Sequence, residues 1–224
     1  MADGLEQHGR EVEIPAGDAV LSGVLHVPVG ARGVVAFAHG SGSGRFSPRN
    51  QFVARELQRA GLATLLLDLL TEDESRDRAK VFDIDLLAER MDLTAGWLAR
   101  EPRTRELRLG YFGASTGAAA ALVSAARLGS AVQAVVSRGG RPDLAADHLG
   151  AVVAPTLLIV GELDDVVLQL NEQAFRRLRC PKDLVVVAGA THLFEEPGTL
   201  EEVARLAAEW FLLHLHHGAA APDD

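Results

Sequence analysis

Residues 107–122 read LRLGYFGASTGAAAAL, and the order of residue types in this stretch decides the fold prediction. Residues 107–112 are mostly apolar, as in a strand that is covered on both faces. The alanine-rich run that closes the stretch favours a helix. Between them stands Ser115, with Gly113 and Gly117 on either side, where a tight turn needs small neighbours. The stretch therefore predicts a strand, a sharp turn at Ser115 and a helix.

Short apolar runs on both sides of this stretch alternate with segments of helical period, which is typical of a mostly parallel sheet covered by helices on both faces. Eight strands are predicted in all, at residues 10–15, 19–27, 33–38, 62–68, 107–112, 132–137, 155–161 and 184–188. The first two alternate more strongly between apolar and polar residues, and a short loop joins them, so we expect an antiparallel start to the sheet. The predicted fold class is α/β.

Helices are predicted between these strands, and four of them have clear start or burial signals. The first begins at the N-cap and proline pair Ser47-Pro48 and ends at Gly61, and the third covers residues 116–129. The buried face of the second is predicted to consist of Leu87, Met91, Thr94, Ala95 and Leu98. The last helix begins with a capping box from Thr199 to Glu202. Its predicted buried residues are Leu200, Val203, Leu206, Ala207 and Trp210.

Composition argues against nucleic-acid and membrane partners. Of 224 residues, 48% are hydrophobic, and 22 basic against 31 acidic residues give a formal net charge of −9. This charge disfavours binding to DNA, RNA or anionic lipid. Lys80 and Lys182 are the only lysines in the sequence, and neither follows a glycine. The sequence therefore has no phosphate-binding Gly-Lys-Ser/Thr loop.

The single cysteine, Cys180, excludes an internal disulfide and a cysteine metal cage. No apolar run is long enough for a membrane span, and residues 1–10 lack the apolar core of a secretory signal. We therefore expect a cytoplasmic protein. No metal or cofactor is expected. One domain is predicted over residues 1–217, followed by a frayed tail at residues 218–224.

Ser115 is a candidate nucleophile. A sharp strand-to-helix turn lifts a serine hydroxyl out at the carboxyl edge of a sheet, and the flanking glycines provide the clearance that this turn needs. The helix N-terminus that follows favours developing negative charge. The alternative is a serine that only caps the helix. The strand before Ser115 and the helix after it favour the nucleophile.

His192 is the candidate base, because a serine hydroxyl is a poor nucleophile until a base removes its proton. It follows the last predicted strand in the segment Gly189-Ala190-Thr191-His192, and it comes after Ser115 in the chain. A loop histidine taken alone is more often a surface residue. Apart from His39, which lies in the loop after the third predicted strand, the remaining histidines precede the sheet or belong to other strands and helices, which makes them poorer candidates.

Asp164 is the candidate acid that would hold the imidazole in its correct tautomer. The strand at residues 155–161 leads into two adjacent aspartates, Asp164 and Asp165, at its carboxyl end. We prefer Asp164 because it lies within the first turn beyond the strand, with Asp165 next and Asp143 a distant third. The alternative is that both adjacent aspartates cap the following helix.

Two backbone N–H groups are needed to bind the oxyanion of a tetrahedral intermediate. One is predicted to be that of Thr116, and the other that of Ser41 in the glycine-rich loop at residues 39–44. The loop does not fit a dinucleotide fingerprint, because the third glycine would fall on Arg45 or Ser47. His39 is expected to be a structural hydrogen-bonding residue rather than a second base.

Taken together, these segments resemble the dienelactone-hydrolase-like branch of the α/β-hydrolases. The matching features, in chain order, are Ala38-His39-Gly40-Ser41-Gly42, the turn from Gly113 to Gly117, the strand at 157–161 followed by Asp164, and Gly189-Ala190-Thr191-His192. The resemblance implies eight strands with the second antiparallel, and metal-free hydrolysis through an acyl-enzyme. Dienelactone hydrolase itself has a cysteine nucleophile, whereas this chain has Ser115, which points towards esters in general.

Arg138 and Arg141 follow the sixth predicted strand, at the edge where ligands of open α/β sheets bind. They hold either a substrate carboxylate or phosphate, or a nearby acid such as Asp143 or Asp164 in a salt bridge. The polar segment at residues 69–80 either overhangs the pocket or forms a solvated loop. The connection between the sixth and seventh strands is too short for a separate lid domain.

The function expected from these residues is hydrolysis of a small or medium carboxylic ester or lactone through an acyl-Ser115 intermediate. The alternative enzymatic function is that of a thioesterase or acyltransferase with the same three residues. A ligand-binding protein on an inactive hydrolase fold is the alternative from another class.

Overall fold

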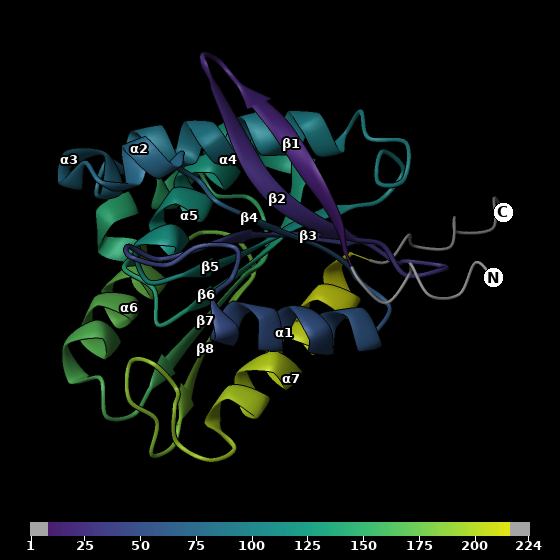
Figure 1. Cartoon of the computed structure of the whole chain (residues 1–224). Coiled ribbons are helices and arrows are strands. Elements are labelled where there is room, and N and C mark those ends of the chain that lie inside the picture. The colour runs from purple at the N-terminus through teal and green to yellow at the C-terminus, as the bar shows by residue number, and fades with distance from the viewer. Residues whose placement is uncertain (1–8, 216–224) are drawn as a thin grey trace, which may run out of the picture.

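The computed structural model describes residues 9–215 as one eight-stranded sheet flanked by helices (Figure 1). The strands are β1 (Arg10–Ala16), β2 (Ala19–His26), β3 (Val34–Ala38), β4 (Ala63–Leu67), β5 (Leu109–Ala114), β6 (Val132–Arg138), β7 (Thr156–Gly161) and β8 (Lys182–Val187). All eight predicted strands are present, with ends that differ from the prediction by no more than two residues.

The strand order across the sheet is β1-β2-β4-β3-β5-β6-β7-β8. β2 pairs antiparallel with both β1 and β4, and the other neighbouring strands pair in parallel. The predicted antiparallel second strand is therefore confirmed. Because β3 to β8 run in one direction, the residues that follow them meet at one edge of the sheet.

Helices cover both faces of the sheet. They are α1 (Pro48–Arg59), α2 (Glu72–Ser75), α3 (Arg78–Val81), α4 (Ile84–Leu98), α5 (Thr116–Leu128), α6 (Asp165–Arg177) and α7 (Thr199–His214). The short 3-10 helices η1 (Gly129–Ala131), η2 (Pro142–Ala145) and η3 (Leu149–Ala151) lie in the connections before β6 and β7.

Two hydrophobic cores lie on opposite faces of the sheet, and β5 contributes to both. Tyr111 packs into the core formed with α4, α5 and α6, whereas its neighbour Phe112 packs into the core formed with α1 and α7. This arrangement follows from strand geometry, because successive side chains point to opposite faces. Figure 1 shows α4 and α5 on one side of the sheet and α1 and α7 on the other. A strand buried on both faces holds the turn at Ser115 in a fixed position.

The first and second predicted helices are confirmed in detail. α1 begins with Pro48 after the N-cap Ser47, whose side chain accepts a hydrogen bond from the Asn50 N–H. Gly61 follows the helix with a φ of +82°, in the left-handed region that glycine tolerates. The five residues predicted for the buried face of α4 are all buried.

The predicted start of the last helix is wrong. The N-cap of α7 is Gly198, and Thr199 is its first helical residue. The Thr199 hydroxyl donates to the backbone oxygen of Glu196 at 2.7 Å, so it does not cap the helix. Val203 and Ala207 are buried as predicted, but Ala204 and Phe211 complete the buried face. The predicted Leu200, Leu206 and Trp210 are only half-buried.

The polar segment at residues 69–80 contains the short helix α2 and most of α3 rather than an irregular loop. Thr71 and Glu74 form a reciprocal capping box at the start of α2. Between residues 9 and 215 the chain forms no separate lid, as predicted. No helix in this part of the chain is long and apolar enough to cross a membrane. The predicted frayed tail at residues 218–224 lies outside the described residues.

Candidate active site

Ser115 lies at the junction of β5 and α5 in a strained backbone conformation. Its φ is +51° and its ψ is −123°, a region that residues other than glycine rarely adopt. The Ser115 N–H donates to the Arg138 oxygen at 3.3 Å. Its own backbone oxygen accepts hydrogen bonds from the N–H groups of Ala118 and Arg141, both at 3.1 Å. These bonds hold the strained turn and leave the side chain at the carboxyl edge of the sheet.

The two glycines beside Ser115 are required by close backbone contacts. A Cβ atom on Gly113 would lie 2.4 Å from the Cα of Ala118. A Cβ atom on Gly117 would lie 2.2 Å from the backbone oxygen of Ala38, at the end of β3. Neither backbone contact can be relieved by a side-chain rotation, so the sharp turn from strand to helix depends on glycine at both positions.

His192 pairs with Asp164 across the loops that follow β8 and β7. His192 Nδ1 lies 2.6 Å from Asp164 Oδ2. Asp165 is exposed and begins α6, so the structure brings Asp164 rather than Asp165 to the imidazole. Asp143 instead binds Arg141. With Nδ1 donating to the carboxylate, Nε2 is left to act as an acceptor.

The loop that carries His192 is held by Glu196, a residue that the sequence analysis did not single out. The Glu196 carboxylate accepts hydrogen bonds from the Thr191 side chain at 2.6 Å and from the Thr191 N–H at 3.1 Å. These bonds lower the pKa of Glu196 below its usual value. Phe194 is buried in the same loop with a φ of +54°. A short, strained loop with an internal carboxylate gives His192 little freedom to move.

The segment Arg138–Arg141 links Ser115 to His192. Gly139 has a φ of +51°, and a Cβ atom there would lie 3.5 Å from both Nδ1 and Cε1 of the His192 ring. The neighbouring Arg138 oxygen and Arg141 N–H both bind the Ser115 backbone. The hydrogen bonds described for the His192 ring include Asp164 but not the Ser115 hydroxyl. A bond between the serine and the base is often not formed before substrate binds, because catalytic hydrogen bonds often tighten only in the complex.

The glycine-rich loop after β3 lies directly against Ser115 and Thr116. A Cβ atom on Gly40 would lie 3.0 Å from the Cβ of Ser115. The Ser41 N–H, predicted to bind an oxyanion, donates to the Thr116 side-chain oxygen Oγ1 at 3.0 Å. The Thr116 N–H, the other predicted donor, makes no hydrogen bond among those described for residues 9–215. The two predicted donors therefore belong to residues in direct contact, and the Thr116 hydroxyl is the group that joins them.

His39 connects this loop to the segment after β4. Its Nε2 lies 3.0 Å from the Leu69 N–H, and its Nδ1 lies 3.0 Å from the Gly40 oxygen. Because the Leu69 amide can only donate, we assign the proton of a neutral ring to Nδ1. Burial lowers the pKa of His39, which favours this neutral form. With both ring nitrogens engaged by backbone groups, His39 has the structural environment that the sequence analysis expected.

The two arginines after β6 have different environments. Arg141 binds Asp143 through two hydrogen bonds of 2.8 and 2.7 Å, and this pairing raises the pKa of Arg141. Arg138 is buried, with an exposed fraction of 7%. Among the described residues it forms no salt bridge, and its Nε has no hydrogen-bond partner.

The contacts of the Arg138 guanidinium are weak. It lies 3.4 Å from Asn50 Oδ1 and 5.9 Å from the centre of the Phe194 ring. Burial and the nearby Arg49 lower the pKa of Arg138 to about 10. The salt-bridge alternative therefore describes Arg141, whereas Arg138 is a buried cation without a carboxylate partner among residues 9–215.

No group of three or more His, Cys, Asp or Glu side chains that could hold a metal ion is found within residues 9–215. The arrangement that the structure does contain is a strained serine, a His–Asp pair and a loop of backbone donors. Such an arrangement can carry out acyl transfer through the serine.

An eight-stranded sheet with this strand order and a serine at the β5–α5 turn defines an α/β-hydrolase fold. Residues 21–213 match the model of the dienelactone hydrolase family, and the chain belongs to this family. The crystal structure of a dienelactone hydrolase from Anabaena variabilis ATCC 29413 is 54% identical, with a TM-score of 0.90. That match covers 93% of this chain and 100% of the other.

Est1E from Butyrivibrio proteoclasticus is 15% identical, with a TM-score of 0.78 over 92% of this chain and 98% of its own. At this identity the likeness concerns the fold. Curated proteins from two strains of Mycobacterium tuberculosis, each named putative phosphoribosyl transferase, are 62% identical over 206 residues. The match covers 92% of this chain but 46% of theirs, so the chain spans about half the length of these relatives. The match to the dienelactone hydrolase family and the 54% identical structure support a hydrolase on the α/β fold.

Proposed function

We propose that this chain hydrolyses a small or medium carboxylic ester or lactone through an acyl-Ser115 intermediate. The observation that carries the proposal is the 2.6 Å pair of His192 and Asp164, held beside the strained Ser115 by the segment Arg138–Arg141. A serine, a base and an acid in this order are the residues that acyl transfer needs.

In the proposed first step, His192 Nε2 takes the proton of the Ser115 hydroxyl while Oγ attacks the ester carbonyl carbon. A C–O bond forms, and the carbonyl electron pair moves onto the oxygen. When the tetrahedral intermediate collapses, the bond to the leaving alcohol breaks and the imidazolium returns the proton to that oxygen. Water then attacks the acyl-Ser115 with His192 again as base, which releases the acid and restores the serine.

Asp164 stabilises the imidazolium that forms in each step. It accepts a hydrogen bond from Nδ1–H, so it fixes the tautomer in which Nε2 is free to take the serine proton. A carboxylate in this position does not take the proton itself. Its contribution is orientation and charge stabilisation.

The oxyanion is bound, in this proposal, by donors at the start of α5. The Thr116 N–H is free to donate among the described hydrogen bonds, and the helix N-terminus adds a partial positive charge. The Thr116 hydroxyl accepts from the Ser41 N–H, so its own hydrogen can point to the oxyanion. Ser41 would then act through Thr116, or would donate directly when a substrate displaces the hydroxyl.

Arg138 is proposed to attract an anionic substituent of the leaving group. Removing a charge from water without a partner is costly, which favours an anion beside a buried guanidinium. Arg138 ends β6, on the same side of Ser115 as the strands that lead to Asp164 and His192. Because His192 must protonate the leaving oxygen, the leaving group is expected on this side.

The curated relatives are named for phosphoribosyl transfer, but this chain matches only about half of their length. We assign the hydrolase chemistry to the matched half, because residues 21–213 belong to the dienelactone hydrolase family. Phosphoribosyl transfer is not proposed for this chain.

The proposal is tested by steady-state hydrolysis of 4-nitrophenyl esters and small lactones with the wild-type chain and Ser115→Ala. We expect turnover by the wild type and a loss of roughly a million-fold in kcat in the variant, because a catalytic triad acts as a unit. Intact mass after rapid acid quenching should show one acyl group on the wild type. Equal turnover by the two proteins would contradict the proposal.

A further inference from the structure

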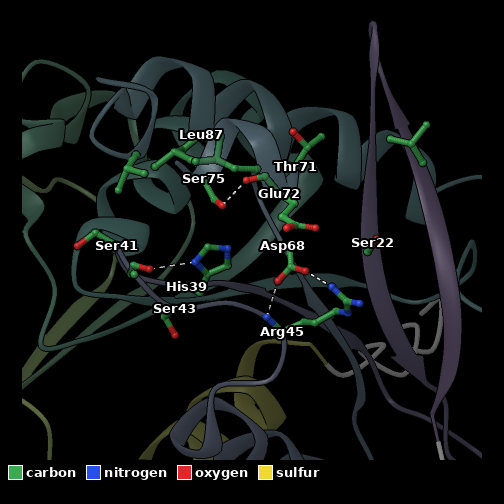
Figure 2. A pocket seen from close by; sticks show the side chains of 15 residues that line it. Ser22, His39, Ser41, Ser43, Arg45, Asp68, Thr71, Glu72, Ser75 and Leu87 are labelled. Carbon is green, nitrogen blue, oxygen red and sulfur yellow. Dashed lines mark hydrogen bonds and ion pairs between the residues drawn. The ribbon is translucent and has the colours of Figure 1, made fainter. Parts of the chain in front are cut away.

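A cavity of about 580 Å³ lies beside the glycine-rich loop and is not part of the His192–Asp164 site. Its walls come from β2, residues 39–45, residues 68–75, α3 and α4. A volume of this size is within the range of small-molecule sites. Figure 2 shows the cavity with His39 at its centre, and Ser41 and Leu87 on different walls.

The cavity begins next to the candidate nucleophile. Gly40 and Ser41 line it, and the same two residues contact Ser115 and Thr116. The cavity and the reaction centre therefore share the loop at residues 39–44. One part of a substrate bound at Ser115 would reach the cavity past this loop.

The sheet order decides which part of the substrate this is. β2, β3 and β4, which lead to the cavity, lie on one side of β5. β6, β7 and β8, which lead to Asp164 and His192, lie on the other side. Because the leaving oxygen must receive its proton from His192, the leaving group lies on that other side. The acyl group then faces the cavity.

The charges around the cavity do not suit an anionic acyl group. Arg45 is the only lysine or arginine among its lining residues, and its guanidinium is paired with Asp68. The Arg45 N–H also donates to the Asp68 carboxylate at 2.7 Å. Glu72 also lines the cavity, and its carboxylate is paired with Arg76 at 2.5 Å. Figure 2 shows the Arg45–Asp68 pair between His39 and Ser22. The cationic group of the cavity is therefore already neutralised by the protein.

Hydroxyl groups and aliphatic side chains share the remaining lining. The Ser22 hydroxyl on β2 and the Ser41 and Ser43 hydroxyls make no hydrogen bond among those described for residues 9–215. The aliphatic part of the lining consists of Val20, Leu70, Val81 and Leu87. Such a lining favours a group that has both hydroxyls and apolar carbon atoms. The serine hydroxyls can hydrogen-bond the former, and the aliphatic side chains can bury the latter.

From this placement we propose that the cavity is the acyl site for an uncharged, hydroxyl-bearing acyl group, such as that of a hydroxy-acid ester or a polyhydroxylated lactone. This assignment rests on the proposed function, and it adds the substrate class. Ser22 and Ser43 hydrogen-bond the hydroxyls of the acyl chain, and the aliphatic wall packs against its carbon atoms.

Three esters with the same leaving group test the assignment. They are 4-nitrophenyl 6-hydroxyhexanoate, 4-nitrophenyl heptanoate and 4-nitrophenyl hydrogen adipate, which end in a hydroxyl, a methyl and a carboxylate. We expect kcat/KM to be highest for the hydroxyl ester, roughly fivefold above the methyl ester for one hydrogen bond. The carboxylate ester should be the poorest substrate.

The double variant Ser22→Ala/Ser43→Ala should bring the ratio of hydroxyl to methyl ester close to one. Both serines are exposed, so the variant is expected to fold. Labelling of its Ser115 by a fluorophosphonate would verify that the site is intact. Ser130→Ala, at an exposed serine in η1 away from the cavity, is the matched control and should keep the wild-type ratio. A preference for the methyl or carboxylate ester, or a ratio unchanged in the double variant, would overturn the acyl-site assignment alone. Absence of turnover on all three esters would overturn the proposed function as well.

Discussion

The Thr116 hydroxyl provides the most specific prediction about catalysis. Thr116→Val removes one hydroxyl and keeps a β-branched side chain of similar size. In the wild type, Thr116 Oγ1 accepts the Ser41 N–H at 3.0 Å and has its own hydrogen available for the oxyanion. The variant loses that donor and leaves the Ser41 N–H without its acceptor, while the Thr116 N–H remains.

The expected loss is that of one oxyanion donor, about 10²–10³ in kcat or about 2.7–4 kcal/mol. Charge develops on the carbonyl oxygen only in the transition state, so KM should change by less than about threefold. The assay is steady-state hydrolysis of 4-nitrophenyl heptanoate over a full range of concentrations. Thr116→Ser keeps the hydroxyl and should keep kcat within about tenfold of the wild type.

Thr94→Val controls for the loss of a buried threonine hydroxyl elsewhere. The Thr94 hydroxyl donates to the Arg90 oxygen within α4, away from Ser115. This variant should lose stability but not kcat. An unchanged kcat in Thr116→Val would refute a role for the hydroxyl in the oxyanion site. An equal loss in Thr116→Val and Thr116→Ser would refute it too, since the serine variant retains the donor.

Three further predictions concern Asp164, His39 and Arg138. Asp164→Asn should lower kcat by about 10⁴, because the imidazole would lose its orienting carboxylate, whereas Asp165→Asn should keep steady-state activity near that of the wild type. Burial lowers the pKa of His39 from its ordinary value of 6.5, so the unfolded chain binds the proton more readily than the folded chain. Stability is therefore expected to fall as the pH drops below about 6.5, by up to about 1.4 kcal/mol per pH unit, and urea unfolding of His39→Gln should show a smaller decrease. Arg138→Ala should lower kcat/KM more for an ester with an anionic leaving group than for its neutral counterpart, and equal losses on the pair would contradict anion binding.

The sequence predicted the strands and the turn at Ser115 because their determinants are local. Residues 107–122 contain the strand, the two small neighbours of Ser115 and the helix in one continuous stretch. The sequence does not separate Asp164 from Asp165 as the partner of His192 as clearly, because both residues follow the same strand end. The structure separates them by helix phase, because Asp165 is already the first residue of α6.

Other features depend on contacts between distant segments and could not be predicted. The bond from Ser41 to Thr116 joins residues 75 positions apart, and the pattern of the glycine-rich loop does not specify it. The predicted start of α7 is wrong for a local reason, because Thr199 and Glu202 match a capping box but the left-handed Gly198 is the N-cap. The buried face then includes Phe211 instead of Trp210, whose indole N–H donates to the Pro155 oxygen at 3.3 Å.

The different environments of Arg138 and Arg141 also depend on contacts that a local sequence pattern does not specify. Arg141 and Asp143 are two residues apart, so their salt bridge was one of the two alternatives that the sequence allowed. The surroundings of Arg138 come from α1 and from the loop after β8, which no local pattern connects to β6. The sequence could place both arginines at the carboxyl edge of the sheet, but it could not separate their environments.

Covalent labelling of Ser115 tests the central claim most directly. The wild-type chain and Ser115→Ala are treated with a fluorophosphonate probe, and intact mass and a peptide map are then recorded. An activated serine predicts one adduct on the wild type, located at Ser115, and none on the variant. A folded wild-type chain without an adduct, or with an adduct on another residue, would contradict the assignment of Ser115 as the nucleophile.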